Sequence, residues 1–167
     1  MLPRQSNKSR RLFAAANGFA FIELIIGIVV VGILVALALN SYGEVQAKSR
    51  DTRRQAAIDT IAAALEACYN GPCKHTYPSL LQLQDDSSGG WVQTNLTHFA
   101  SSTLYDSKLN KIQGDAPDVN GEYQYQPLKA NGQQCPIGMN QVCAGYILRA
   151  WQEQRPDSSY TKRSLNN

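Results

Sequence analysis

One carboxylate stands inside an otherwise uncharged, apolar segment of the sequence. Residues 19–39 are 21 residues long, and Glu23 is their only charged residue. At about 1.5 Å per residue, a helix of this length crosses a hydrocarbon core of about 30 Å. An ionised side chain inside that core costs roughly 2.5–3.5 kcal/mol. Glu23 weakens the segment as a membrane anchor, and we therefore expect it to serve something other than anchoring.

The cysteines form a second group with possible chemistry, and all of them follow the apolar segment. They are Cys68, Cys73, Cys135 and Cys143. An even number outside a membrane segment indicates two disulfides formed in an oxidising compartment. We favour Cys68–Cys73 and Cys135–Cys143, because each pair closes a short loop that contains turn residues. The alternative is a zinc site made by all four thiolates, although four and seven intervening residues are wide spacings for zinc knuckles.

No other group of residues predicts catalysis or a metal site. His75 and His98 lie 23 positions apart with no third ligand at metal spacing. Asp115 and Asp118 are two loop carboxylates, too few for Ca²⁺, which takes about six to eight oxygens. No nucleophile lies near a general base in the sequence pattern. We expect a protein that is not an enzyme and that holds no metal or cofactor.

The net charge of +3 comes from the first 18 residues. Without them, 12 basic residues face 13 acidic ones, so the rest of the chain lacks the basic excess that nucleic acid requires. The basic residues of this leader are Arg4, Lys8, Arg10 and Arg11.

The elements that would carry these residues begin with one long helix. No proline lies between residues 19 and 71, so a helix can continue from Phe19 to Tyr69. Asn70-Gly71-Pro72 then predicts its end. Its second half carries an apolar stripe with helical spacing, which needs a partner on one face. The stripe consists of Ile58, Ile61, Ala62, Leu65 and Tyr69.

The carboxyl-terminal part predicts a small antiparallel sheet. Residues 122–126 alternate with period two, and residues 144–152 are rich in strand formers, including Tyr146, Ile147 and Trp151. The Cys135–Cys143 loop lies between them, which favours a hairpin that covers the helical stripe. Residues 154–167 are polar and are expected to be a flexible tail.

These expectations combine into an α+β fold. Residues 1–18 are a leader, residues 19–70 are a long helix whose first half, 19–39, enters the membrane, and residues 71–167 are a globular head.

The segment NGFAFIELIIGIVVVGILVALA resembles the amino terminus of type IV prepilins and type II secretion pseudopilins. In that family a basic leader ends in Gly, an aromatic residue follows, and Glu is the fifth mature residue. The segment SRDTRRQAAIDTIAAALEACYNGPCKHTYPS also resembles the helix end of these proteins. The resemblance implies a pilin fold. It also implies that prepilin peptidase cleaves between Gly18 and Phe19 and methylates the new amine of Phe19.

The resemblance further implies that the processed chain polymerises into a surface filament. The amine of Phe19 would meet Glu23 of a neighbouring subunit and fix the stagger between helices. Partners would be other pilin subunits, the peptidase and an assembly platform in the membrane. The prepilin would reside in the cytoplasmic membrane and the assembled pilus outside the cell. Adhesion, twitching motility and DNA uptake are the activities that such filaments support.

The sequence departs from the family at Asn40, where many members have proline. That proline eases local melting of the helix. Gly32 and Asn40 are therefore our candidates for a melting site, since a glycine costs a helix roughly 1 kcal/mol relative to alanine. Gly27 is a second glycine of this segment, and small residues also allow close helix packing.

Several alternatives remain open at the level of sequence. Within the family, the chain could be a major pilin, a minor pilin or a pseudopilin. Outside it, the apolar segment could be a secretory signal cleaved after Ala38, or an anchor for a monomeric extracytoplasmic binding domain. The basic residues that follow the segment could contact lipid headgroups or a neighbour's acidic residues, or form a solvated turn. They are Lys48, Arg50, Arg53 and Arg54.

Overall fold

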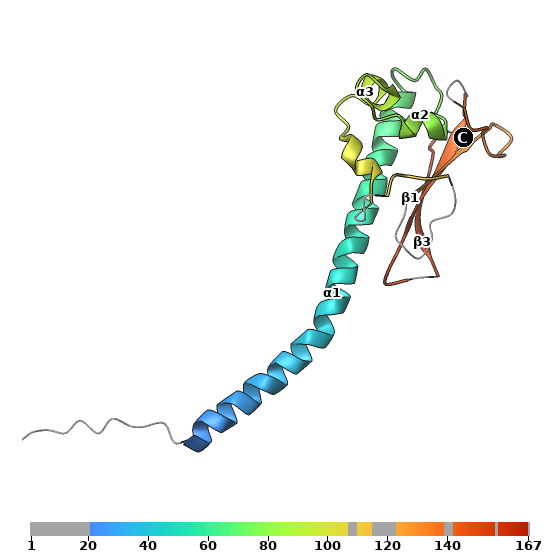
Figure 1. The fold of residues 1–167 in the computed structure, drawn as a ribbon. Coiled ribbons are helices and arrows are strands. Elements are labelled where there is room, and N and C mark those ends of the chain that lie inside the picture. Colours follow the sequence, from blue (N-terminus) through green and yellow to red (C-terminus); the bar gives the residue numbers. More distant parts are fainter. Residues whose placement is uncertain (1–20, 107–109, 115–122, 139–141, 156, 167) are drawn as a thin grey trace, which may run out of the picture. The chain divides into compact units, whose positions relative to one another are not determined.

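The fold comes from a computed structural model of the 167-residue chain, which describes residues 21–106, 110–114, 123–138, 142–155 and 157–166 (Figure 1). The elements in chain order are helix α1 (Phe21–Tyr69), helix α2 (Leu80–Gln84), helix α3 (Trp91–Asn95), the 3₁₀ helix η1 (Ser101–Leu104), and strands β1 (Tyr123–Leu128), β2 (Gly145–Trp151) and β3 (Ser159–Arg163).

The chain divides into two compact units, residues 1–41 and residues 42–167, and α1 contributes to both. The described part of the first unit is helical throughout. The second unit, called the head below, contains the rest of α1 and all other elements.

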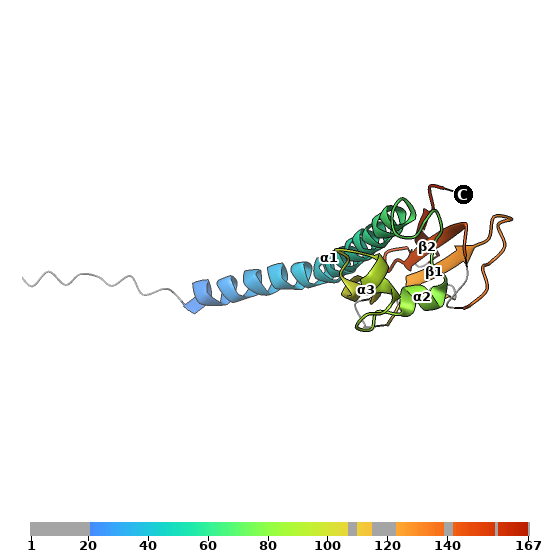
Figure 2. The same ribbon diagram turned by 90° about the horizontal axis from the view of Figure 1, so that it is seen from above.

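The sheet of the head has the strand order β1-β2-β3, and both pairs are antiparallel. Tyr125 lies opposite Leu148, which in turn lies opposite Lys162. Figure 2 shows the sheet beside the last turns of α1, with α2 and α3 near the same end of that helix. The predicted hairpin between β1 and β2 is confirmed, and the α+β fold with it.

The core of the head lies between the helical stripe and the sheet. Ile58, Ile61 and Leu65 are completely buried, as are Tyr125 and Leu148 on the strands. Alternate strand residues point to this core because side chains alternate between the two faces of a sheet. The stripe predicted from its helical spacing is therefore the buried face of α1 in the head.

The two disulfides of the structure are Cys68–Cys73 and Cys135–Cys143, the pairing favoured from the sequence. The first closes the turn that ends α1, where the backbone N–H of Cys73 donates to the carbonyl of Cys68 at 2.9 Å. The second closes the loop between β1 and β2. The backbone N–H of Tyr77 donates to the carbonyl of Cys143 at 2.9 Å, so the two disulfide-closed segments are joined.

The prediction of a flexible tail at residues 154–167 is wrong, because β3 occupies Ser159–Arg163. The strand is polar, it pairs with β2, and two of its side chains contact α1, which is far from it in the sequence. The Tyr160 hydroxyl donates to Asp59 at 2.9 Å, and Lys162 forms an ion pair with the same carboxylate at 2.8 Å.

Helices α2 and α3 also occupy a stretch that the sequence indicates only as loops. A capping box between Ser79 and Gln82 begins α2.

Candidate assembly surface

The large apolar side chains of the apolar segment of α1 are exposed in the described chain. Phe21 is 78% exposed and Leu39 is 68% exposed, and the large apolar residues between them are exposed as well. The helix is long and apolar enough to cross a membrane by length and composition. An apolar surface of this extent marks a site of protein or membrane interaction.

Glu23 borders a shallow depression on this surface. The depression forms at Gly27, where no side chain is present, and Leu24, Ile28 and Val31 complete its lining. A Cβ atom added at Gly27 or at Gly32 would meet nothing within 4 Å. Packing among the described residues therefore gives no reason for either glycine.

The sequence also predicts a cleavage site and two candidates for helix melting in this segment. Gly18 and Phe19 lie outside the described residues. Gly32 and Asn40 lie within the continuous helix α1. Melting at either position stays a prediction.

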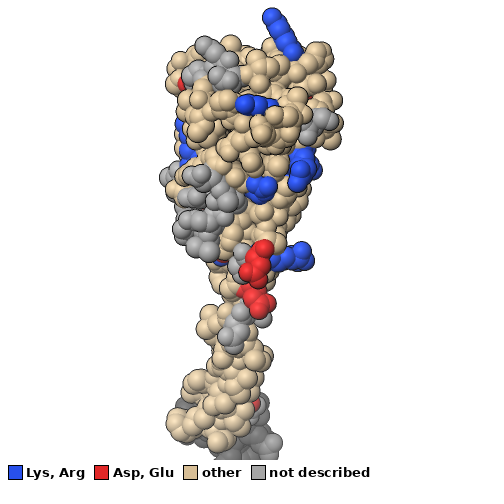
Figure 3. Space-filling model, turned by 90° about the vertical axis from the view of Figure 1, so that its right-hand side faces the viewer, with Lys and Arg blue, Asp and Glu red and all other residues tan. Residues whose placement is uncertain are grey.

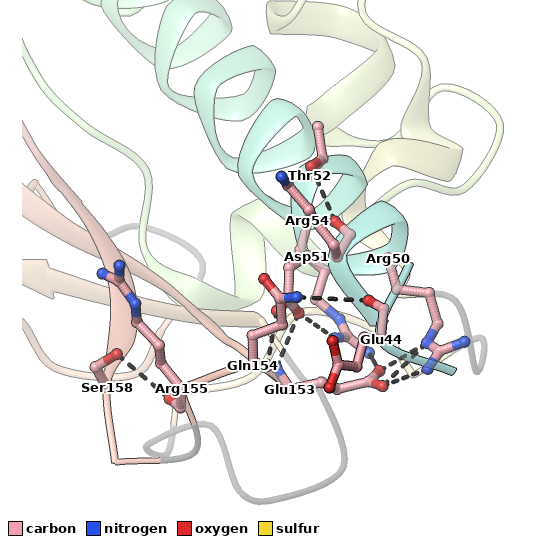
Figure 4. Close-up of polar contacts among 10 residues, drawn as sticks. Glu44, Arg50, Asp51, Thr52, Arg54, Glu153, Gln154, Arg155 and Ser158 are labelled. Carbon is pink, nitrogen blue, oxygen red and sulfur yellow. Dashed lines mark hydrogen bonds and ion pairs between the residues drawn. The ribbon is translucent and has the colours of Figure 1, made fainter. Parts of the chain in front are cut away.

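A charged cluster in the head joins α1 to the connection between β2 and β3. Arg54 is only 2% exposed, and its two terminal nitrogens donate to Asp51 at 2.9 Å and to Glu153 at 2.8 Å (Figure 4). Its guanidinium also lies over the ring of Trp151, 5.6 Å from the centroid. The expectation that Arg54 contacts lipid, a neighbour or solvent is therefore wrong, because acids of its own chain hold it.

Glu153 is the centre of this cluster. Arg50 donates to both of its carboxylate oxygens, at 2.9 and 2.6 Å. The hydrogen bonds from Arg50 are the main cause that lowers the pKa of Glu153 to about 2, and the hydrogen bond from Arg54 acts in the same direction. The carboxylate of Asp51 accepts the backbone N–H groups of Glu153 and Gln154 at 2.9 and 3.0 Å. We call these four residues, Arg50, Asp51, Arg54 and Glu153, the head clasp.

A second carboxylate, Glu66, holds the end of the chain. It accepts the hydroxyls of Tyr77 and Tyr146, both at 2.9 Å. It also accepts the backbone N–H of Leu165 at 3.2 Å and the side-chain amide of Asn166 at 3.1 Å. Burial is the main reason that the pKa of Tyr77 rises to about 12, so this hydroxyl stays a donor at neutral pH.

The described residues contain no group of three or more His, Cys, Asp or Glu side chains arranged to hold a metal ion. The rings of His75 and Tyr69 pack edge to face, with their centroids 5.2 Å apart. All four cysteines are in disulfides, which rules out the zinc alternative for this structure. Asp115 and Asp118 lie outside the described residues. On the face seen in Figure 3, basic side chains are separated by uncharged surface.

The chain matches the type IV major fimbrial protein FimA of Dichelobacter nodosus, with 27% identity over 127 residues. The match covers 74% of this chain and 72% of that protein. This chain is similar to type IV pilins. No family model and no solved structure matches it. The type IV pilin resemblance seen in the amino-terminal segment is thereby confirmed, and it extends over most of the chain, including at least part of the head.

Proposed function

We propose that this protein is the structural subunit of a type IV pilus filament. The observation that carries the proposal is the exposed apolar surface of α1 with Glu23 as its only charge. The similarity to a type IV major fimbrial protein supports the same role. Burial of this surface against equivalent helices drives assembly, because burying apolar area is favourable by roughly 25 cal/mol per Å².

Glu23 sets the register of the helices in the filament. Prepilin peptidase cuts between Gly18 and Phe19 and methylates the new amino group. The positive amine of one subunit then meets Glu23 of its neighbour in a dry core. Either charge alone in that core is strongly penalised, so one stagger between helices is favoured over others. The pair needs to add no net stability to perform this role.

The chain resides first in the cytoplasmic membrane and then in the pilus on the cell surface. Two disulfides fit a head that folds in an oxidising compartment. Its partners are other copies of the subunit, the peptidase and the assembly platform. The heads form the outside of the filament, where adhesion, twitching motility or DNA uptake takes place. The protein is a building block and not an enzyme.

Replacing Glu23 by Ala tests the register role. We expect normal membrane insertion but loss of sheared surface filaments, measured by quantifying the subunit in membrane and sheared fractions. Glu44→Ala is the matched control, because Glu44 is an exposed carboxylate of α1 beyond the apolar segment. Filament yield that is unchanged in Glu23→Ala would contradict the proposal.

Intact-mass and amino-terminal analysis of the sheared protein tests processing. We expect a chain that begins at N-methylated Phe19. A chain that begins at Leu39 would instead indicate a secreted domain with a discarded signal, and one that begins at Met1 would indicate a permanent anchor.

A further inference from the structure

The depression beside Glu23 on the apolar segment of α1 has a volume of about 390 Å³. Leu24, Gly27, Ile28 and Val31 complete its lining, so all of its residues belong to one helix, which fixes their relative positions. A Cβ atom added at Gly27 would meet nothing within 4 Å, so the missing side chain leaves this space open. The helix alone therefore forms an apolar floor with one carboxylate at its amino-terminal end.

Only one place in the apolar segment combines a carboxylate with a missing side chain. Glu23 is the only acid of residues 19–39, and Gly27 follows it by four residues. Residues four apart lie on the same face of a helix, about 6 Å apart along its axis. Gly32, the other glycine of the segment, does not line the depression. An occupant that satisfies both features must present a positive charge and an apolar group about one helical turn apart.

A second, processed copy of this chain presents such a pair of groups at one residue. Residues 19–39 contain no lysine, arginine or histidine, and the first basic residue after them is Lys48. Once the leader is removed between Gly18 and Phe19, the new amine is the only positive charge that the apolar segment of a second copy carries. The aromatic ring of Phe19 is joined to the same Cα atom through a single CH₂ group, so the charge and the apolar group lie next to each other.

Other occupants satisfy only one of the two features. A lipid acyl chain, or a leucine or isoleucine of another helix, would fill the apolar floor but leave the carboxylate of Glu23 without a partner. In a dry core an unpaired charge is strongly penalised. An amine alone would pair with Glu23 but leave the space at Gly27 empty, and the atoms that line a void lose their contacts. Charge and shape together therefore favour the first residue of a second processed copy.

We propose that this depression seats the aromatic ring of Phe19 from a neighbouring subunit, while the methylated amine of the same residue pairs with Glu23. This inference rests on the proposed function and adds a second contact to it. Glu23 selects the charge and Gly27 leaves room for the ring, so Gly27 is a specificity-determining residue of assembly. A phenylalanine side chain buries roughly 150–250 Å² when it is enclosed. A shift of one helical turn would lose both the ion pair and this seat, so the stagger is fixed more sharply than by charge alone.

An exchange of side-chain size between the two positions tests this seat. We expect Gly27→Leu, which fills the depression, to lower the amount of sheared subunit about tenfold or more, the factor that overpacking a fitted site costs. Adding Phe19→Ala removes the ring that would clash, so the sheared amount should recover severalfold. The matched control is Gly32→Leu, because a Cβ there also meets nothing but the position does not line the depression. Phe19→Ala should give no recovery in that control.

Photo-cross-linking in sheared filaments measures the contact directly. The variant Phe19→p-azidophenylalanine keeps the ring, and it is produced as a minor share of the subunits together with the unmodified chain. Ultraviolet light then joins the modified ring to the group that it touches. We expect cross-linked peptides that contain residues 24–31 of a neighbouring subunit. Because unmodified subunits make up most of each filament, this measurement does not depend on whether Phe19→Ala assembles by itself.

A normal filament yield in Gly27→Leu would overturn the inference, as would equal recovery of Gly27→Leu and Gly32→Leu by Phe19→Ala. Absence of recovery, where Phe19→Ala alone assembles, would mean that Gly27 serves only the close approach of helices, which also overturns it. Where Phe19→Ala alone does not assemble, the cross-links decide, and cross-links to lipid or to residues outside 24–31 overturn the seat.

The filament yield of Glu23→Ala separates this inference from the proposed function. If Glu23→Ala loses its filaments while the seat fails these tests, the register set by charge stands and only the place of the ring is wrong. If Glu23→Ala assembles normally, the register role itself is wrong.

Discussion

At the scale of single residues, Glu153 makes head stability depend on pH. Its pKa is about 2 in the folded head and 4.5 without partners, chiefly because of the hydrogen bonds from Arg50. A carboxylate with a lowered folded pKa stabilises fully above its unfolded pKa, and the stabilisation disappears as pH falls from about 4.5 toward 2. We expect Glu153→Gln to lower the free energy of unfolding at pH 7 by roughly 2 kcal/mol.

Urea unfolding of the full chain in detergent, followed at pH 7 and again at pH 3, measures this effect. The difference between Glu153→Gln and the unmodified chain should shrink at the lower pH. Asp157→Asn is the control, since Asp157 is an exposed carboxylate of the same connection. If the difference in unfolding free energy between Glu153→Gln and the unmodified chain is the same at both pH values, the head clasp stabilises the head through packing and not through the charge of Glu153.

The head clasp also shows which residue-scale features a sequence does not reveal. Arg54 and Glu153 are 99 positions apart, and Arg50 and Glu153 are 103 positions apart. The basic residues of α1 look alike in the sequence, and only the folded chain separates the buried Arg54 from the exposed Arg53. Glu23 is recognisable from the sequence because the signal is local: it is the single charged residue of an apolar segment.

At the scale of elements, substitution of a glycine in α1 distinguishes an effect on the stability of the helix from an effect on its packing against a neighbouring helix. A Cβ atom at Gly27 meets no described residue within 4 Å, so Gly27→Ala should stabilise the helix by up to about 1 kcal/mol. If Gly27 instead allows a neighbouring helix to approach closely, the same change should reduce sheared filaments severalfold without reducing membrane insertion. Filament yield and membrane content of the variant, measured in the same cells, decide between these effects.

Gly43→Ala is the matched control, because a Cβ there also meets nothing and the position lies beyond the apolar segment. A normal filament yield in Gly27→Ala would mean that the depression beside Glu23 takes no part in assembly.

Elements with a local period were predictable, and those held by distant contacts were not. The period of 3.6 residues and the absence of proline indicated α1, and a period of two indicated β1. Strand β3 has mostly polar residues and a weak pattern, and its anchoring depends on Asp59 of α1. The same holds for the last residues, where Glu66 of α1 holds Leu165 and Asn166.

At the scale of the whole molecule, the two units should respond separately to loss of a disulfide. The core and both disulfides belong to residues 42–167, whereas the apolar surface from Phe21 to Leu39 belongs to residues 1–41. We expect Cys135→Ser/Cys143→Ser to destabilise the head by about 2–3 kcal/mol, because the bond restricts the unfolded chain. Membrane insertion should be unchanged, since α1 is long and apolar enough to cross a membrane by its own length and composition.

Thermal circular dichroism and flotation with lipid vesicles, carried out on one preparation of the full chain, measure both properties. The unmodified chain with a reductant added provides the control for the serine substitutions. A lower melting temperature with full flotation would show that folding of the head and membrane insertion of the apolar helix are separate. Loss of flotation together with loss of head stability would instead mean that the apolar helix inserts into the membrane only when the head is folded. That result would contradict the prediction that the two units act separately.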